Sequence, residues 1–283
     1  MTNPDQSIAV QVRGMSKSYG RLHAVRELDL DVAYGEVVAI LGPNGAGKTT
    51  TIEILEGHRR RDAGHVRVLG EDPGNAGRGW RSRIGIVLQE ASDFGMLTVA
   101  ETVTMFAKCY GRVRESGEVL DLVGLGSTSG SKVRTLSGGQ RRRLDVALGI
   151  IAMPELLFLD EPTTGFDPEA RRQFWDLIRL LARDGTTIVL TTHYLEEAAA
   201  LADRVAVIAG GRVVAVDSPT RLTAHANSAA TVRWVHDGEV HVEETHHPTE
   251  LIRQRSAGGV ELGQLTVTRP TLEDAYLRLI GLQ

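Results

Sequence analysis

The chain reads Gly42-Pro43-Asn44-Gly45-Ala46-Gly47-Lys48-Thr49, which matches the phosphate-binding pattern Gly-x-x-x-x-Gly-Lys-[Ser/Thr] throughout. An apolar run at 37–41 precedes this stretch, and a helical pattern at 49–57 follows it. In such a strand–loop–helix unit, the loop's backbone N–H groups and the positive end of the helix face a phosphate. We therefore expect these residues and Thr50 to contact ATP, with Lys48 on the β- and γ-phosphates and the Thr49 hydroxyl on Mg²⁺.

A second motif consists of two adjacent carboxylates, Asp160 and Glu161, at the end of the apolar run 156–159. Such a pair can also simply end a buried strand. Downstream of a phosphate-binding loop, however, Asp160 can hold Mg²⁺ through a water molecule, opposite Thr49. Glu161 can polarise the attacking water as a general base. The two motifs together predict a nucleotide hydrolase.

The pattern around these motifs predicts a parallel α/β core, because apolar strand-like runs alternate with helical patterns. Buried strands are expected at 84–88, 156–159 and 187–190, and a helix at 168–183. The largely helical stretch 98–151 lies between two of these strands and is predicted to be an inserted subdomain. Alternating runs at 8–32 predict a small antiparallel sheet.

The character of the chain changes after residue 217. Alternating valines flank a hairpin signal at Asp237-Gly238, and helical and strand-like patterns follow it, which predicts a compact α+β unit. A final helix is expected from Thr271, with Leu272, Tyr276 and Leu279 on one docking face. We therefore predict a nucleotide-binding domain at 1–222 and a small α+β domain at 223–283.

The pentapeptide Leu136-Ser137-Gly138-Gly139-Gln140 lies between the phosphate-binding loop and the acidic pair. In this position it resembles the signature motif of ATP-binding cassette (ABC) proteins. The resemblance implies that Ser137, Gly138, Gly139 and Gln140 contact the γ-phosphate of ATP held by an opposite subunit. It also implies an ABC ATPase core with an antiparallel β subdomain and an inserted helical subdomain.

Further positions match the family's motifs in the same order. Tyr19 stands where the family has an aromatic residue stacked on adenine, although it could also be a structural tyrosine. Gln89 matches the Q-loop glutamine that senses Mg²⁺ and touches the membrane partner, and His193 matches the switch histidine at the γ-phosphate. Asp167 matches the D-loop, where Phe166 departs from the more usual leucine. The resemblance therefore implies catalytic roles for Lys48, Gln89, Glu161 and His193, ATP contacts from Tyr19 and Asp167, and metal contacts from Thr49, Gln89 and Asp160.

The closing stretch 269–277 resembles the last helix of ATPases that work with ABC-2-type exporters, particularly the daunorubicin-resistance group. The resemblance implies an ATP-hydrolysing subunit that pairs as an ATP-dependent homodimer and drives a separate transmembrane permease. It would act from the cytoplasmic side of the membrane. Two alternatives are a soluble ABC ATPase with a non-transport role and a nucleotide-binding regulator without turnover. The sequence lacks a linker to a second cassette, and Glu161 and His193 argue against loss of turnover.

Composition limits the partners and the compartment. A net charge of −4 lacks the basic footprint of nucleic-acid binding, so we expect no nucleic acid. The single cysteine, Cys109, provides no disulfide framework and is typical of a reducing cytosol. We also expect no signal peptide, and no apolar run approaches the roughly 18 to 20 residues that cross a bilayer.

Two clusters of side chains leave alternatives open. The arginine runs 59–61 and 141–143 are expected to lie on solvated faces, with contact to lipid or a partner as the alternative. Four histidines are expected on and after a hairpin, with a metal site as the alternative: His236, His241, His246 and His247.

Overall fold

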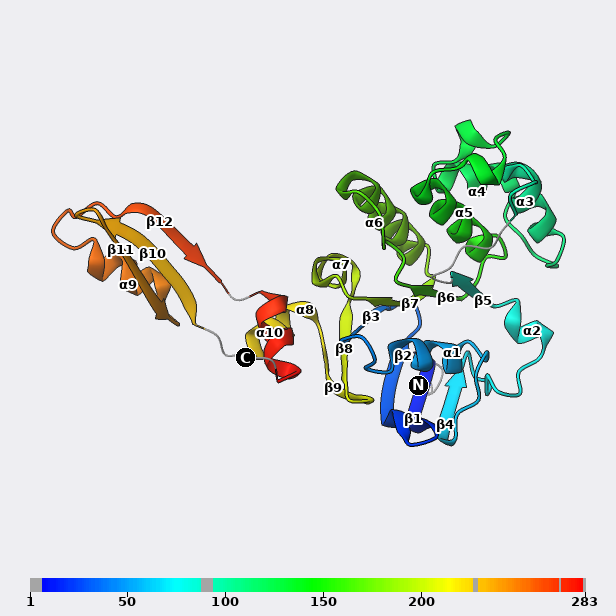
Figure 1. The fold of residues 1–283 in the computed structure, drawn as a ribbon, viewed down its shortest axis with the longest axis horizontal. Coiled ribbons are helices and arrows are strands. Elements are labelled where there is room, and N and C mark those ends of the chain that lie inside the picture. The colour runs from blue at the N-terminus through cyan, green and yellow to red at the C-terminus, as the bar shows by residue number, and fades with distance from the viewer. Residues whose placement is uncertain (1–6, 88–93, 226–228, 270, 282–283) are drawn as a thin grey trace. The chain divides into compact units, whose positions relative to one another are not determined.

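A computed structural model describes residues 7–87, 94–225, 229–269 and 271–281 (Figure 1). The chain forms two compact units, Met1–Val216 and Asp217–Gln283. The predicted domain boundary at 222/223 falls within helix α8 (Pro219–His225) and stays a prediction. Among the described residues, no helix is long and apolar enough to cross a membrane.

The first unit is organised around a six-stranded sheet with the order β5-β6-β7-β3-β8-β9. The strands from β5 to β8 run parallel, and β3, β6 and β7 consist entirely of buried residues, as their apolar sequences predict. The carboxyl ends of parallel strands meet at one edge, so the segments that follow β3, β6 and β7 converge there. The bounds are β3 Val37–Leu41, β5 Ile84–Val87, β6 Leu156–Asp160, β7 Thr187–Thr192, β8 Arg204–Ala209 and β9 Arg212–Asp217.

The predicted antiparallel sheet at the start of the chain is confirmed and extended by a strand. Its order is β2-β1-β4, formed by β1 (Ile8–Tyr19), β2 (Leu22–Ala33) and β4 (Ala63–Val68). Helix α1 (Lys48–Leu55) contacts β2, β4 and β6, and one apolar core joins this sheet to the central one. Short helix α2 (Arg78–Arg81) buries Trp80, whose indole Nε1 donates to the Val68 carbonyl at 2.7 Å.

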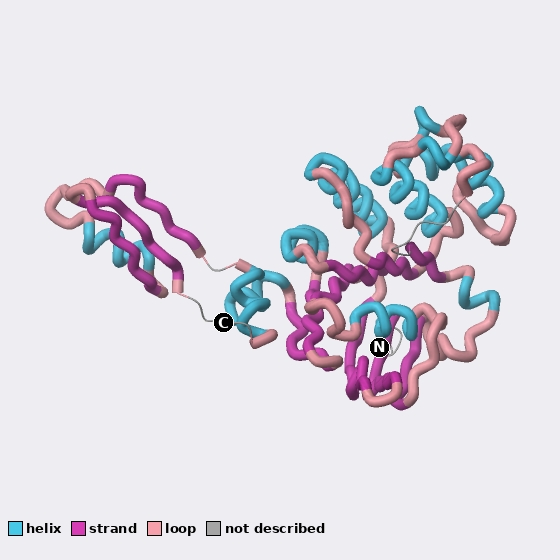
Figure 2. The backbone as a smooth tube through the Cα atoms, viewed as in Figure 1, coloured by secondary structure: helices cyan, strands magenta, loops and turns pink. Residues whose placement is uncertain are grey.

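The predicted helical insertion is present between β5 and β6 (Figure 2). It contains α3 (Val99–Ala107), α4 (Ser116–Leu122), two short 3₁₀ turns (Gly126–Thr128 and Val133–Thr135) and α5 (Gly138–Ile150). Capping boxes begin two of these helices, because Thr98 with Glu101 and Ser137 with Gln140 satisfy the N–H groups that each helix leaves unpaired. Beyond the insertion, α6 (Pro168–Arg183) and α7 (Leu195–Leu201) separate the remaining strands.

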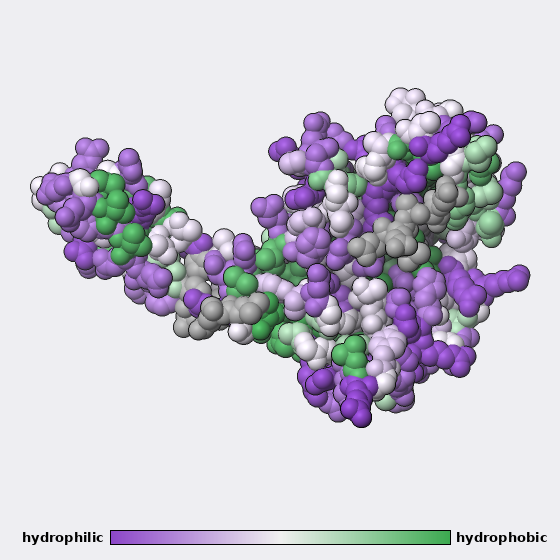
Figure 3. All heavy atoms as spheres, viewed as in Figure 1, coloured by the Kyte–Doolittle hydropathy of each residue, from purple (hydrophilic) through white to green (hydrophobic). Residues whose placement is uncertain are grey.

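The second unit contains the predicted α+β elements. Its sheet has the order β11-β10-β12, and the sheet packs Val232 and Trp234 against Leu251 of α9. Its elements are α8, β10 (Ala230–His236), β11 (Glu239–Thr245), α9 (Pro248–Arg255), β12 (Gly263–Thr268) and α10 (Leu272–Leu279). Figure 3 shows apolar side chains on the surface of this unit. On the two edge strands, Val240, Val242, Leu265 and Val267 are exposed.

The last helix begins as predicted but buries a different set of residues. Thr271 caps α10 together with Asp274. Leu272 is buried and Tyr276 half-buried, whereas Leu279 is exposed, so its predicted place on a docking face is wrong. Ala275, which lies one turn after Leu272, is buried in its place. The side of α10 that is buried is therefore confined to its first five residues, Leu272 to Tyr276.

Candidate active site

Two positions of the loop after β3 leave no room for a side chain. Gly47 has φ 105°, and a Cβ there would lie 2.3 Å from the Ala24 carbonyl oxygen. A Cβ on Gly42 would lie 2.4 Å from the Ile208 carbonyl oxygen. Because Gly47 is the N-cap of α1 and has no side chain, it leaves the N–H groups of the first helical turn to an external acceptor. This arrangement fits a phosphate group.

Lys48 is the first residue of α1, and its side chain is folded back over this loop. Its Nζ donates to the carbonyl oxygens of Gly42 at 2.8 Å and Pro43 at 3.2 Å, and the residue is only 7% exposed. Burial lowers the pKa of Lys48, while Glu161 and Asp160 act in the opposite direction. The ammonium group therefore lies in the field of the acidic pair. Thr49 is exposed on the same turn, and Thr50 is half-buried.

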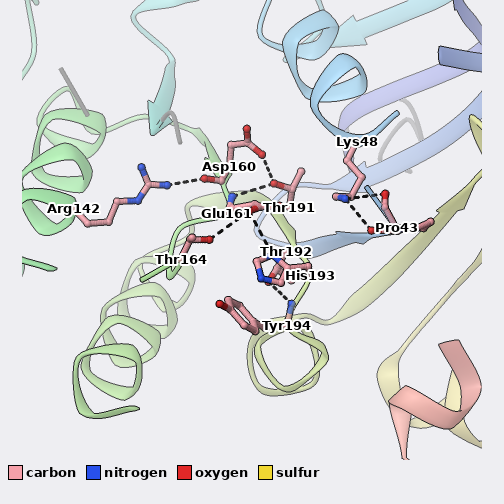
Figure 4. Close-up of polar contacts among 11 residues, drawn as sticks. Pro43, Lys48, Arg142, Asp160, Glu161, Thr164, Thr191, Thr192, His193 and Tyr194 are labelled. Atoms are coloured by element: carbon pink, nitrogen blue, oxygen red, sulfur yellow. Dashed lines mark hydrogen bonds and ion pairs between the residues drawn. The ribbon is translucent and has the colours of Figure 1, made fainter. Parts of the chain in front are cut away.

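The acidic pair is held by the neighbouring strand β7 (Figure 4). The Thr191 hydroxyl donates to Asp160 Oδ1, and its Oγ1 accepts the backbone N–H of Glu161 at 3.1 Å. The Thr191 carbonyl accepts the same N–H, also at 3.1 Å. Glu161 Oε2 lies 3.4 Å from His193 Nδ1 and accepts from the Thr164 hydroxyl at 3.4 Å. The segments after β6 and β7 thus bring Asp160, Glu161 and His193 together.

Glu161 has an unusual backbone conformation, with φ 44°. Such left-handed values are uncommon for non-glycine residues and cluster at functional sites. The Thr191 contacts restrain the peptide on its amino side. Sequence reading missed Thr191, although the parallel register places it directly beside Asp160.

Arg142 corrects the prediction for the second arginine run. It was expected on a solvated face, but it is only 8% exposed. Its Nη2 donates to the Asp160 carbonyl at 2.6 Å and its Nε to the Pro162 carbonyl at 3.1 Å. A signal was present in the sequence, because Arg142 lies one and two helical turns before the buried Val146 and Ile150. A helical stripe otherwise made of core residues indicates that the guanidinium faces inward.

The loop that begins α5 is held in shape but lies at the surface. The Ser137 N–H donates to Gln140 Oε1 at 3.0 Å, and the Gln140 N–H donates to Ser137 Oγ at 3.2 Å. Ser137 and Gly138 are exposed. A Cβ at Gly138 or Gly139 would meet nothing within 4 Å. Packing within the described part of this chain therefore does not explain why glycine stands at either position.

The remaining predicted site residues have the following places. Tyr19 is 40% exposed, and the Arg59 guanidinium lies over its ring at 5.3 Å. Asp167 caps α6, its Oδ1 accepting the N–H groups of Glu169 and Ala170. Phe166 is buried edge-on against Phe174 in that helix, which accounts physically for an aromatic residue here. Gln89 lies outside the described residues.

Within the described residues, no group of three or more His, Cys, Asp or Glu side chains could hold a metal ion, the C-terminal histidines included. His241 instead stacks on Trp234 with ring centroids 5.3 Å apart. In the first unit, the Thr49 hydroxyl and the Asp160 carboxylate offer the oxygen ligands that Mg²⁺ prefers, when substrate phosphates supply others. The residues at this edge of the sheet therefore fit Mg²⁺ bound together with a nucleotide.

The sequence is similar to that of proteins of known function. Residues 25–164 match the ABC transporter family. The chain is 44% identical to a daunorubicin/doxorubicin resistance ATP-binding protein of Streptomyces peucetius, over 85% of this chain and 74% of that protein. It is 31% identical to a linearmycin resistance ATP-binding protein of Bacillus subtilis, over 96% of this chain and 98% of that protein. With a Nod factor export ATP-binding protein of Rhizobium sp. it shares 37% identity over 97% of each.

Solved structures of similar fold include an ATP-binding subunit of an ABC transporter. That structure has a TM-score of 0.69 and 24% identity, and the match covers 77% of this chain and 92% of the other. A dimeric post-hydrolysis state of an ATP-binding cassette, bound to ADP and phosphate, has a TM-score of 0.67 and 25% identity. The second match covers 74% of this chain and 98% of that one.

Proposed function

This chain belongs to the ABC transporter family as an ATP-hydrolysing subunit, and we propose that it powers an ABC-2-type exporter through a separate transmembrane permease. Relatives that are named for antibiotic resistance or for export support this proposal. It would act from the cytoplasmic face of the membrane, on cargo of the drug, lipid or polysaccharide class.

The observation that carries the proposed mechanism is the meeting of three segments at one edge of the central sheet. The loop after β3 leads into Lys48 at the start of α1, β6 ends at Asp160 with Glu161 directly after it, and the segment after β7 carries His193. We propose that residues 42–50 hold the phosphates of ATP, with Lys48 on the β- and γ-phosphates and Tyr19 against the adenine. In the chain alone Lys48 Nζ bonds two loop carbonyls, so binding exchanges these acceptors for phosphate oxygens.

We assign the proton transfer to Glu161. Its carboxylate is positioned by His193 and Thr164 and can accept a proton from the water that attacks the γ-phosphate. Thr49, Asp160 and Gln89 would hold Mg²⁺, which when bound neutralises charge on the phosphate oxygens. His193 would donate to the γ-phosphate.

A second copy would complete each site. Gly138 and Gly139 stand in open space at an ordered helix start, where a ligand from outside the subunit could approach the backbone closely. We propose that Ser137, Gly138, Gly139 and Gln140 of one copy contact the γ-phosphate held by the other, with Asp167 at the junction. The chain would then work as an ATP-dependent homodimer.

Replacing Glu161 by Gln tests the assignment of the base. The amide cannot accept the proton, so single-turnover hydrolysis should fall by about 10²- to 10⁴-fold. ATP affinity, measured by calorimetry, should stay close to that of the unmodified chain, because the phosphate loop is untouched. Glu155→Gln is the matched control, since Glu155 precedes β6 and pairs with Arg83 at 2.7 Å, at the other end of the same strand. Hydrolysis by Glu161→Gln within a few-fold of the unmodified chain would remove Glu161 from this role.

A further inference from the structure

A buried guanidinium holds the backbone on both sides of Glu161. Arg142 Nη2 donates to the carbonyl of Asp160, the residue before Glu161, at 2.6 Å. Its Nε donates to the carbonyl of Pro162, the residue after Glu161, at 3.1 Å. Pro162 is itself buried, so both bonded carbonyls are at the bottom of the site rather than at its surface. A single side chain from α5 therefore spans the turn that presents the carboxylate. Figure 4 shows its contact with Asp160.

This turn needs such a restraint, because Glu161 has φ 44°. A non-glycine residue stays in the left-handed region only where its surroundings fix the conformation. On the side of β7, Thr191 holds the Glu161 N–H through its carbonyl and its hydroxyl. On the side of α5, Arg142 holds the flanking carbonyls. The peptide groups around Glu161 are thus clamped from two directions.

We infer that Arg142 is a positioning residue for hydrolysis, which holds the Glu161 carboxylate in place through the Asp160 and Pro162 carbonyls. The inference rests on the proposed role of Glu161 as general base. Arginine suits this place because its planar guanidinium offers donors in a fixed fork, whereas lysine offers a single ammonium on a flexible stem. The same helix α5 begins at the Ser137 loop, so one rigid element would link the loop offered to the second copy with the base of its own subunit.

Replacing Arg142 by Ala tests the inference by separating binding from chemistry. ATP affinity should stay nearly unchanged, while single-turnover hydrolysis should fall by about 10- to 100-fold, the cost of a reacting group displaced by about 1 Å. Arg143→Ala is the matched control, because it removes a guanidinium from the next position of α5 that bonds Gln173 instead. It should hydrolyse ATP at the rate of the unmodified chain.

Two further measurements separate positioning from a general loss of structure. Ethylguanidinium, added below denaturing concentration, should restore part of the hydrolysis by Arg142→Ala, and ethylammonium should not. Arg142→Lys should retain ATP binding and show a smaller loss than Arg142→Ala. If Arg142→Ala fails to bind ATP, Arg142→Lys is used for the test instead. Hydrolysis by Arg142→Lys at the rate of the unmodified chain would then overturn the inference.

The double variant Arg142→Ala with Glu161→Gln decides whether Arg142 acts through Glu161. If Arg142 acts through Glu161, adding Arg142→Ala to Glu161→Gln should change the residual rate by less than about twofold. Independent losses that multiply would show that Arg142 acts elsewhere and would overturn the inference. A Glu161→Gln variant with full activity would instead refute the proposed general base. Strong loss in Glu161→Gln with none in Arg142→Ala would refute only the positioning role.

Discussion

Glu56 is a buried carboxyl in a field of other negative charges, which leads to a prediction about stability. It lies directly after α1, is only 4% exposed and lines a cavity of about 560 Å³ together with Phe106 and Tyr110. Its Oε2 lies 3.2 Å from Nδ1 of His58. Burial raises the pKa of Glu56 from 4.5 to about 8, and the negative charges of Asp160 and Glu53 act in the same direction. We therefore expect the folded chain to hold a proton on this carboxyl at neutral pH.

The sign and size of the effect follow from linkage. Between pH 4.5 and about 8 the folded chain binds more protons at Glu56 than the unfolded chain, so the free energy of unfolding falls as pH rises. At 1.36 kcal/mol for each pH unit, this window corresponds to a loss of at most about 5 kcal/mol. In Glu56→Gln the side chain at this position is an amide, which is neutral at every pH. Its free energy of unfolding, relative to that of the unmodified chain, should therefore rise by several kcal/mol from pH 5 to pH 9.

The assay is urea unfolding at a series of pH values without nucleotide. Introducing Trp234→Phe throughout leaves Trp80 and Trp175 to report on the first unit alone, which avoids mixing the transitions of the two units. Glu71→Gln is the control, because Glu71 is half exposed and pairs with Arg83 only at 4.0 Å. It should follow the pH dependence of the unmodified chain. A Glu56→Gln profile parallel to that of the unmodified chain would refute the buried, protonated carboxyl.

The remaining predictions concern the C-terminal unit, for which we propose a role in pairing or in holding the permease. A stop after Val216 should leave ATP affinity nearly unchanged, because the residues of the site precede it, and should weaken co-purification with the permease from detergent extract. Loss of ATP binding by a folded truncation would contradict this division. Removing α10 alone should lower solubility more than the full truncation does, because it uncovers the buried Leu222 of α8. Equal solubility of the two truncations would argue against that packing.

The helices and strands of this fold could be predicted because the residue pattern of each segment indicates its structure without reference to distant parts of the chain. The run Val37–Leu41 is apolar throughout, and the helix Pro168–Arg183 was predicted with the bounds it has. The hairpin between β10 and β11 turns at Asp237-Gly238, as its sequence indicates. The order of motifs along the chain also pointed to Lys48, Asp160, Glu161 and His193, and the parallel strands then bring their segments to one edge of the sheet.

What the sequence could not predict depends on contacts between distant segments. The periodicity of α5 indicates that Arg142 faces inward, but it cannot name the partners: only the closeness of α5 to the end of β6 brings the guanidinium onto the Asp160 and Pro162 carbonyls. The left-handed backbone of Glu161 likewise has no local signal, since it depends on Thr191 of the adjacent strand. Leu279 fits the periodicity of a buried face but is exposed, because the buried side of α10 ends at Tyr276.

If two copies of this chain complete each other's ATP sites, ATP must bring two chains together, and the mass of the particle with ATP tests this most directly. In light scattering, Glu161→Gln with ATP and Mg²⁺ should give roughly twice the 30.7 kDa of one chain, because ATP binds without being consumed. Adding Ser137→Arg places a cation and bulk in the open space beside Gly138, so the double variant should bind ATP yet keep the mass of one chain. Equal, ATP-dependent doubling of mass in both variants would contradict the shared site.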